Sequence, residues 1–157
     1  MDTVLGTIGP KTIDPRCASQ SDGGDNPRNP AEKPPKRILV VDDEALIRWS
    51  VSETLTSMGM EVDEALDAAS AVKCLSEHGP FEVVVLDFRL PDNDDLTLLK
   101  RVRAMSPESA VILMTAFDTP EVAENAIRLG ASTIVGKPFE LREMGHLVET
   151  LAANRHH

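Results

Sequence analysis

The sequence predicts an α/β fold, in which a parallel sheet is covered by helices on both faces. Short apolar segments rich in β-branched residues alternate with segments whose apolar residues recur at helical spacing. Two of the short segments, residues 38–41 and 111–114, contain only apolar side chains, as expected for strands buried on both faces. This alternation favours parallel strands joined by right-handed helical crossovers.

Five segments are expected to be strands. The strongest are residues 38–41 and 81–86, and a weaker strand covers about 61–65. Residues 111–114 and 132–136 complete the set. Periodicity alone leaves the order of these strands in the sheet open.

Five helices are expected between and after the strands. Asp67 is a suitable N-cap, because a carboxylate accepts hydrogen bonds from the free N–H groups of a first helical turn. Thr119 followed by Pro120 also begins a helix, because proline at the first helical position loses no needed donor. The helices are expected to end at or before Gly59, Gly79, about Ala104, Gly130 and about Ala153.

The composition divides the chain into a leader and one domain. Residues 1–35 hold six of the eleven prolines and four of the nine glycines, and they show no hydrophobic period. Such a segment buries too little apolar surface to offset its ordering entropy. We therefore expect a disordered leader over residues 1–35, a folded domain over 36–153 and a short tail over 154–157.

The charge of the chain is uneven. The formal net charge is −10, and residues 1–37 carry five acidic and six basic side chains, so the remainder carries 21 acidic and 10 basic ones. A domain this acidic repels phosphate backbones and anionic membranes, so we expect no direct binding to nucleic acid or membrane. Cations and basic protein surfaces suit it better.

Two further features favour a cytoplasmic location. No apolar stretch approaches the length of a membrane helix, and the N-terminus lacks the pattern of a signal peptide. Cys17 and Cys74 have neither metal-ligand spacing nor an evident pairing, and both are expected to be ordinary residues of a reducing compartment.

Polar side chains follow four of the predicted strands at the point where each ends. These are Asp42 and Asp43, Asp87, Thr115 and Lys137. Each has an ordinary explanation when taken alone, since an acid after a strand is often a helix cap, a threonine a loop residue and a lysine a surface charge. Ligands of open α/β sheets bind outside the carboxyl ends of the strands, so the coincidence of all five favours one shared pocket.

The chemistry of such a pocket is restricted. Carboxylates that lie close together repel, so at least one pKa rises unless a cation is present, and oxygen ligands of this kind suit Mg²⁺. A carboxylate held against Mg²⁺ can attack a phosphoryl donor and form an aspartyl-phosphate. The transition state is loose, so positioning and charge neutralisation supply most of the catalysis. Lys137 can neutralise phosphoryl oxygens, and Thr115 offers a hydroxyl donor.

Four segments resemble the motifs of the two-component response-regulator receiver family. They are Val40-Val41-Asp42-Asp43-Glu44, Leu86-Asp87-Phe88-Arg89-Leu90-Pro91, Met114-Thr115-Ala116 and Gly136-Lys137-Pro138-Phe139. They occur in the order and spacing of the family, between about Lys36 and Leu151. The Ile47-Arg48-Trp49 stretch is most similar to receivers of the nitrogen-regulator type. The resemblance implies a flavodoxin-like (βα)5 three-layer sandwich whose parallel five-stranded sheet has the order 2-1-3-4-5.

The resemblance also implies roles for the metal-binding and acceptor residues. Asp87 is expected to be the phosphoacceptor and a metal ligand. Asp43 is expected to bind Mg²⁺ directly and Asp42 mainly through a water molecule. The backbone carbonyl of Arg89 is expected to complete the metal ligands that the protein supplies.

Further expectations from the resemblance concern the phosphoryl group and the partners. Thr115, Ala116 and Lys137 are expected to bind the phosphoryl group, and the Lys137–Pro138 bond to be cis. The implied donor is a phosphohistidine on a sensor histidine kinase or a phosphotransfer protein. A phosphorylation-dependent homodimer through the fourth helix, last strand and last helix is a further expectation.

Three residues depart from the family pattern. Ile134 stands where the family usually has Tyr or Phe, so the shift between inactive and active populations is expected to be smaller or to use other groups. Asp95 stands where glycine is typical, and its charge is expected to weaken docking of an acidic partner. Arg89 either lies over the phosphate and slows hydrolysis or is a solvent-exposed arginine.

The leading hypothesis is a phosphoacceptor signalling module that is not itself a turnover enzyme. An alternative is a phosphorylation-independent interaction domain, which Ile134 and Asp95 suggest but which leaves the five pocket residues unexplained. A second alternative is a Mg²⁺-dependent phosphohydrolase with Asp87 as nucleophile. Such enzymes typically need an acid two residues after the nucleophile as proton donor, and Arg89 occupies that position.

Overall fold

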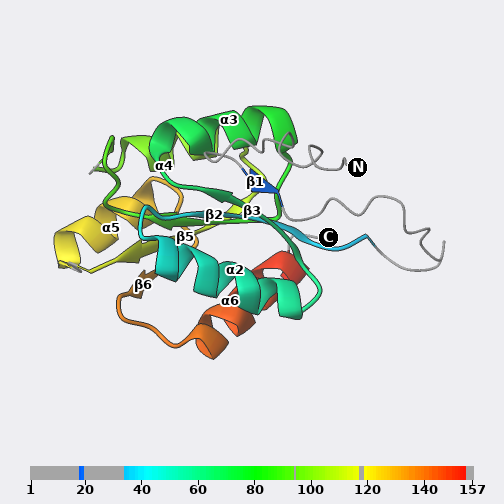
Figure 1. Ribbon diagram of the computed structural model, residues 1–157. Helices are drawn as coiled ribbons and strands as arrows, with labels where there is room; N and C mark the ends of the chain where they lie inside the picture. The colour runs from blue at the N-terminus through cyan, green and yellow to red at the C-terminus, as the bar shows by residue number, and fades with distance from the viewer. Residues whose placement is uncertain (1–17, 20–33, 94, 117–118, 155–157) are drawn as a thin grey trace, which may run out of the picture.

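A mostly parallel sheet forms the middle layer of the domain. The computed structural model describes residues 18–19, 34–93, 95–116 and 119–154. Within these residues the strands are β1 (Ala18–Ser19), β2 (Arg37–Val41), β3 (Glu61–Ala65), β4 (Val83–Asp87), β5 (Ala110–Thr115) and β6 (Thr133–Gly136). Their order is β1-β3-β2-β4-β5-β6 (Figure 1). The pairs among β2 to β6 are all parallel, and their order confirms the predicted 2-1-3-4-5.

Helices cover both faces of the sheet. They are α2 (Ala45–Ser57), α3 (Ala68–His78), α4 (Thr97–Met105), α5 (Pro120–Arg128) and α6 (Leu141–Asn154). The α3, α4 and α5 helices bury apolar side chains on one face, and α2 and α6 do so on the other (Figure 1). Every residue of β4 and β5 is buried, which explains why these strands are apolar almost throughout.

The helix boundaries follow from local signals in the sequence. The Asp67 carboxylate accepts a hydrogen bond of 2.8 Å from the amide three residues later and so begins α3. Thr119 begins α5 in the same way, with Pro120 as its first residue. Gly59 and Gly130 have φ angles of 91° and 112°, and this left-handed backbone lets the chain leave α2 and α5 at little cost.

The β1 strand was not expected from the sequence. Ala18–Ser19 pair antiparallel with β3, at the edge of the parallel strands. An edge strand presents unpaired N–H and C=O groups, which a short segment can satisfy through its backbone, whatever its composition. The remaining residues of the predicted leader below 34, which are 1–17 and 20–33, lie outside the described residues. So do 155–157 of the predicted tail, and α6 ends at Asn154.

Cys74 differs from its expected state. It lies in α3 with no exposed surface, in the core between α3 and the sheet. It is disulfide-bonded, so the expectation of an ordinary reduced cysteine is wrong for this residue. Cysteine spacing cannot reveal such a bond, because the pairing depends on which segments the fold brings together. The same expectation for Cys17 falls outside the described residues.

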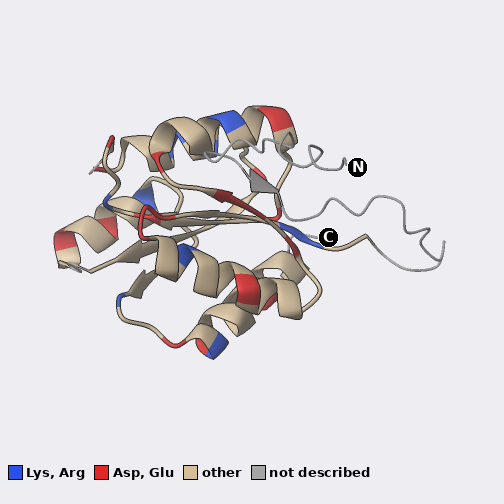
Figure 2. Ribbon diagram, viewed as in Figure 1, with Lys and Arg blue, Asp and Glu red and all other residues tan. Residues whose placement is uncertain are grey.

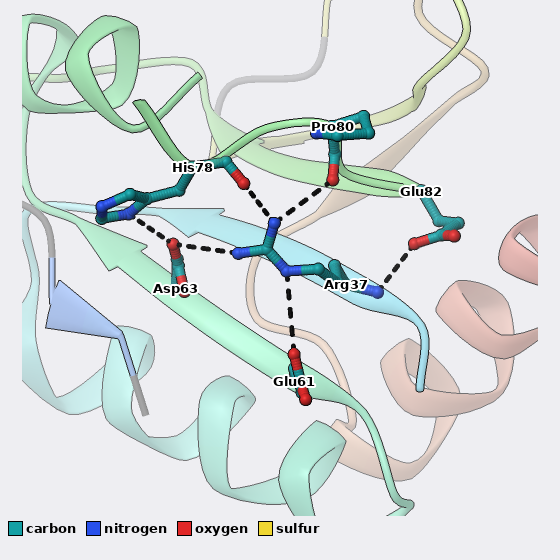
Figure 3. A network of polar contacts seen from close by, with 6 residues as sticks. All are labelled: Arg37, Glu61, Asp63, His78, Pro80 and Glu82. Carbon is teal, nitrogen blue, oxygen red and sulfur yellow. Dashed lines mark hydrogen bonds and ion pairs between the residues drawn. The ribbon is translucent and has the colours of Figure 1, made fainter. Parts of the chain in front are cut away.

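Arg37 links three segments at the amino end of the sheet (Figure 3). Its guanidinium lies 3.5 Å from a carboxylate oxygen of Asp63 and 3.8 Å from one of Glu61, both on β3. It also donates to the carbonyl of His78 and lies 4.8 Å from the ring centre of Phe81. Asp63 is buried and lies 2.9 Å from the His78 ring. These contacts hold β2, β3 and the end of α3 together.

Charged residues lie in both helical layers and in the loops (Figure 2). Acidic positions occur at the rim where the strands end as well as on the helices. Among the described residues, no helix combines the length and the apolar character needed to cross a membrane.

Candidate functional site

The predicted pocket residues meet at the carboxyl ends of four neighbouring strands. Asp42 and Asp43 follow β2, Asp87 ends β4, Thr115 ends β5 and Lys137 follows β6. These strands are adjacent in the sheet, and parallel strands end at the same edge. The fold therefore brings to one rim residues that are far apart in the sequence.

Three carboxylates converge at this rim. Single carboxylate oxygens of Asp42, Asp43 and Asp87 all lie within 4.8 Å of one another. Asp42 and Asp87 are buried, whereas Asp43 is exposed. An oxygen-only set with one solvent-facing member suits a hard divalent cation that keeps part of its water shell. The cluster can hold such a metal.

The acceptor candidate Asp87 carries an unfavourable charge in this setting. Burial raises the pKa of Asp87 from 3.8 to about 7, and the nearby charge of Asp42 adds to the effect, while Lys137 opposes it. The one ammonium beside Asp87 therefore does not offset the effects of burial and of Asp42 on its carboxylate. A bound cation would lower this pKa, so the residues present fit a metal.

Lys137 contacts three carboxylates at once. Its Nζ lies 3.1 Å from Asp87 Oδ2, 3.1 Å from Asp42 Oδ2 and 3.2 Å from Glu44 Oε1. Burial lowers the pKa of Lys137, but the charges of Asp42 and Asp87 outweigh it, so the pKa lies above its usual value. The side chain is therefore an ammonium ion at neutral pH.

Backbone contacts hold the other side of the pocket. The amide of Lys137 donates to the carbonyl of Thr115 at 2.8 Å, which continues the pairing of β5 with β6. Thr115 is buried and Ala116 is exposed at the end of β5. The Lys137–Pro138 peptide bond is cis.

Sequence reasoning missed two residues that support the pocket. Glu44 shares the Lys137 ammonium, and its amide donates to Asp42 Oδ1 at 2.8 Å. Arg48 donates to the carbonyl of Asp42 at 2.8 Å and pairs with Glu64 of β3 at 3.1 Å. Glu44 directly follows the acid pair and Arg48 lies one helical turn later, which is the signal that was available. Together they fix the backbone and the carboxylate of Asp42.

The segment after Asp87 is anchored on both sides of Arg89. The amide of Phe88 donates to the carbonyl of Met114 at 2.8 Å, and Leu90 is buried in the core. Arg89, whose carbonyl is a predicted metal ligand, lies between these two anchors with its side chain exposed.

Ile134 and Asp95, which depart from the family pattern, each make defined local contacts. Ile134 is half-buried and packs against the core on the α3 side of the sheet. Asp95 accepts a hydrogen bond of 2.9 Å from the amide of Thr97, and this bond lowers the pKa of Asp95. The aspartate that stands in place of the usual glycine therefore binds the first amide of α4, while Leu96 is the N-cap residue of that helix.

Known proteins with related sequences share this domain. Residues 38–149 match the family described as response regulator receiver domain. The chain is 37% identical over 113 residues to the regulatory protein AtoC of Escherichia coli, a match that covers 72% of this chain and 24% of AtoC. It is 34% identical over 105 residues to the chemotaxis protein CheY of Bacillus subtilis, covering 66% of this chain and 87% of CheY.

A solved structure with the same arrangement supports the assignment. The receiver domain of NtrX from Brucella abortus superposes with a TM-score of 0.68 at 34% identity, covering 74% of this chain and 98% of that domain. The chain spans about a quarter of the length of AtoC and of the DNA-binding transcriptional regulator NtrC of Proteus hauseri. It belongs to the response regulator receiver domain family.

Proposed function

We propose that this chain is a phosphoacceptor of two-component signal transduction that receives a phosphoryl group on Asp87. The observation that carries the proposal is the convergence of Asp87 with Asp42 and Asp43, with the Lys137 ammonium 3.1 Å from the acceptor carboxylate. Members of the family are typically phosphoacceptors rather than enzymes with sustained turnover. The donor we propose is a phosphohistidine of a sensor histidine kinase or phosphotransfer protein.

Mg²⁺ is the proposed metal. Asp42, Asp43 and Asp87, whose carboxylates converge, would hold it, Asp42 mainly through a water molecule. The backbone carbonyl of Arg89 would complete the ligands that the protein supplies. When bound, Mg²⁺ neutralises charge on the phosphoryl oxygens and on the crowded carboxylates. The raised pKa of Asp87, about 7, supports this assignment, because burial and then the charge of Asp42 disfavour the carboxylate more than Lys137 favours it, and a bound cation would favour it.

The transfer follows from the positions of the side chains. A carboxylate oxygen of Asp87 attacks phosphorus, an O–P bond forms, and the N–P bond of the phosphohistidine breaks. The imidazole nitrogen leaves with the electron pair. Lys137 is already an ammonium beside the acceptor and takes up charge on one phosphoryl oxygen. The Thr115 hydroxyl donates to another phosphoryl oxygen. The transfer therefore requires little from the protein beyond positioning and charge neutralisation.

The two other candidate functions have less support. A phosphohydrolase of this chemistry typically needs an acid two residues after the nucleophile as proton donor, and Arg89 occupies that position. A phosphorylation-independent interaction domain would have no use for Lys137 locked between Asp42 and Asp87. We therefore propose signalling with slow loss of the phosphoryl group.

We propose that the receiver domain covers residues 36–153 and acts in the cytoplasm, after a leader of 1–35 and before a tail of 154–157. Its acidity argues against direct contact with nucleic acid or an anionic membrane.

A homodimer formed on phosphorylation through α5, β6 and α6 is the proposed output. A sedimentation experiment that shows a monomer both before and after phosphorylation would contradict this proposed homodimer.

One experiment separates the candidate functions. The protein is incubated with Mg²⁺ and acetyl phosphate, and its intact mass is recorded. We expect one added phosphoryl group, which is lost with a chelator and absent from Asp87→Ala. Absence of any adduct on the folded wild type would favour the interaction domain. Rapid release of phosphate over many turnovers would favour the hydrolase.

A further inference from the structure

A tight turn follows the acceptor strand and carries Asp92 near its tip. The amide of Leu90 donates to the carbonyl of Asn93 at 2.8 Å, and the amide of Asn93 donates back at 3.1 Å. Pro91 restricts the backbone between them. The turn is therefore a rigid unit, with Leu90 buried at its base and Asp92 exposed.

Asp92 ties this turn to another element. One of its carboxylate oxygens accepts from the amide of Ala68 at 2.8 Å, and the other accepts from the amide of Ala69 at 3.1 Å. These are the first two amides of α3, and the third is satisfied by Asp67. A carboxylate at a helix N-terminus is also favoured by the helix dipole. The contact joins segments that are far apart in sequence.

The tether restrains the backbone between the turn and the acceptor. Only Phe88 and Arg89 separate Asp87 from the turn that begins at Leu90. On the acceptor side, the Phe88 amide is fixed to the carbonyl of Met114 at 2.8 Å. On the far side, the turn has two restraints, the buried Leu90 side chain and the Asp92 contact with α3.

We infer that Asp92 is a positioning residue for the divalent cation. By holding the turn against α3, it fixes the path of the chain through Arg89, whose carbonyl is the proposed backbone ligand. Asp92 acts through the turn and does not touch the metal. The inference rests on the proposed function, because it concerns the ligand set of the same site. Losing such support weakens metal binding while leaving the reacting groups in place.

The test compares Asp92→Ala, Asp92→Asn and Asp95→Asn with the wild type. Asp95→Asn is the matched control. It removes one exposed carboxylate from the same loop, but Asp95 binds the first amide of α4 and does not contact α3 through a described hydrogen bond. Mg²⁺ binding is measured by calorimetry. Exchange of the Ala68 and Ala69 amides is followed by NMR without metal, and the rate of phosphorylation by acetyl phosphate is followed against Mg²⁺ concentration.

For Asp92→Ala we expect Mg²⁺ affinity to fall by about 3- to 10-fold, less than for a buried supporting group because Asp92 is exposed. Both alanine amides should exchange faster. The phosphorylation rate at saturating Mg²⁺ should stay within about twofold of wild type, because the reacting groups are unchanged. Asp92→Asn keeps one acceptor oxygen and should recover part of the Mg²⁺ affinity. The Mg²⁺ affinity of Asp95→Asn should lie within about twofold of that of the wild type.

Three results would overturn the inference. Wild-type affinity in Asp92→Ala would show that the tether does not position a ligand. Equal losses in Asp92→Ala and Asp95→Asn would show that only the loop charge matters. A wild type that binds no Mg²⁺ and forms no adduct would remove the proposed function and the inference with it, and this result is distinguished by its appearance before any substitution.

Discussion

The ammonium of Lys137 lies 3.1 Å from a carboxylate oxygen of Asp87, although β5 lies between the strands that carry these residues. The Lys137 amide also donates to the carbonyl of Thr115 at 2.8 Å. The lysine is therefore held at the acceptor before any phosphoryl group arrives.

Lys137→Ala tests this arrangement. Phosphorylation by acetyl phosphate should slow by about 100-fold, because the group that neutralises a phosphoryl oxygen is removed. The measurement is the rate of adduct formation at saturating Mg²⁺. Lys137→Arg keeps the charge but changes its geometry and should recover only part of the rate. A rate for Lys137→Ala close to that of wild type would contradict the proposed role.

Asp87→Asn should stabilise the metal-free protein at neutral and higher pH. The pKa of Asp87 is 3.8 ordinarily and about 7 in the fold, so between these values the folded state binds more protons than the unfolded state. The contribution of Asp87 to stability therefore falls as the pH rises from about 4 to 7, and the penalty is constant above that. The shift sets an upper limit of about 4 kcal/mol, and we expect about 1–3 kcal/mol.

Urea denaturation of Asp87→Asn and wild type at pH about 4 and 8 measures this difference. The two proteins should have similar free energies of unfolding at the lower pH and should diverge at the higher one. Added Mg²⁺ should stabilise the wild type more than Asp87→Asn. A variant less stable than wild type at pH about 8 without metal would be inconsistent with an Asp87 carboxylate that burial and the charge of Asp42 disfavour.

Arg37→Ala should destabilise the domain without affecting the phosphoryl chemistry. The substitution leaves the buried Asp63 carboxylate with His78 but without its guanidinium partner (Figure 3). Because Arg37 is partly exposed, we expect a loss of about 1–3 kcal/mol in the free energy of unfolding. The phosphorylation rate of the folded variant should stay near that of wild type. An unchanged free energy of unfolding would show that the contacts of Arg37 contribute little to stability.

Ser52→Ala should be neutral or stabilising. Among the described residues, the Ser52 hydroxyl is buried in α2 and has no hydrogen-bond partner. An unpaired buried hydroxyl is unfavourable, and alanine also has the higher helix propensity, so we expect a gain of up to about 1 kcal/mol. Thermal denaturation measures it, with the exposed Ser57→Ala change in the same helix as control. A clear loss of stability in Ser52→Ala would indicate a partner for this hydroxyl.

The parallel part of the fold was predictable because its signals are local. Apolar runs marked β2, β4 and β5 most strongly, and β3 and β6 more weakly. Asp67 and Thr119 marked helix starts through bonds made within one turn. The β1 strand was not predictable, because Ala18–Ser19 pair through backbone groups that the edge of β3 leaves open. The disulfide of Cys74 was missed because it depends on tertiary proximity.

The candidate site was predictable in part for a related reason. Asp42, Asp87 and Lys137 could be grouped because strand ends of a parallel sheet meet at one rim. The supporting contacts of Arg48 and Asp92 were missed, because they depend on how α2 and α3 lie against the loops. Such orientations arise from packing and leave no periodic pattern in the sequence.

The position of the phosphoryl group on the protein decides whether Asp87 is the acceptor. Wild-type protein phosphorylated with acetyl phosphate and Mg²⁺ is treated with borohydride, which reduces an acyl phosphate to an alcohol, and the modified peptide is identified by mass spectrometry. We expect modification at Asp87 alone. Modification at Asp42 or Asp43 with Asp87 intact would contradict it.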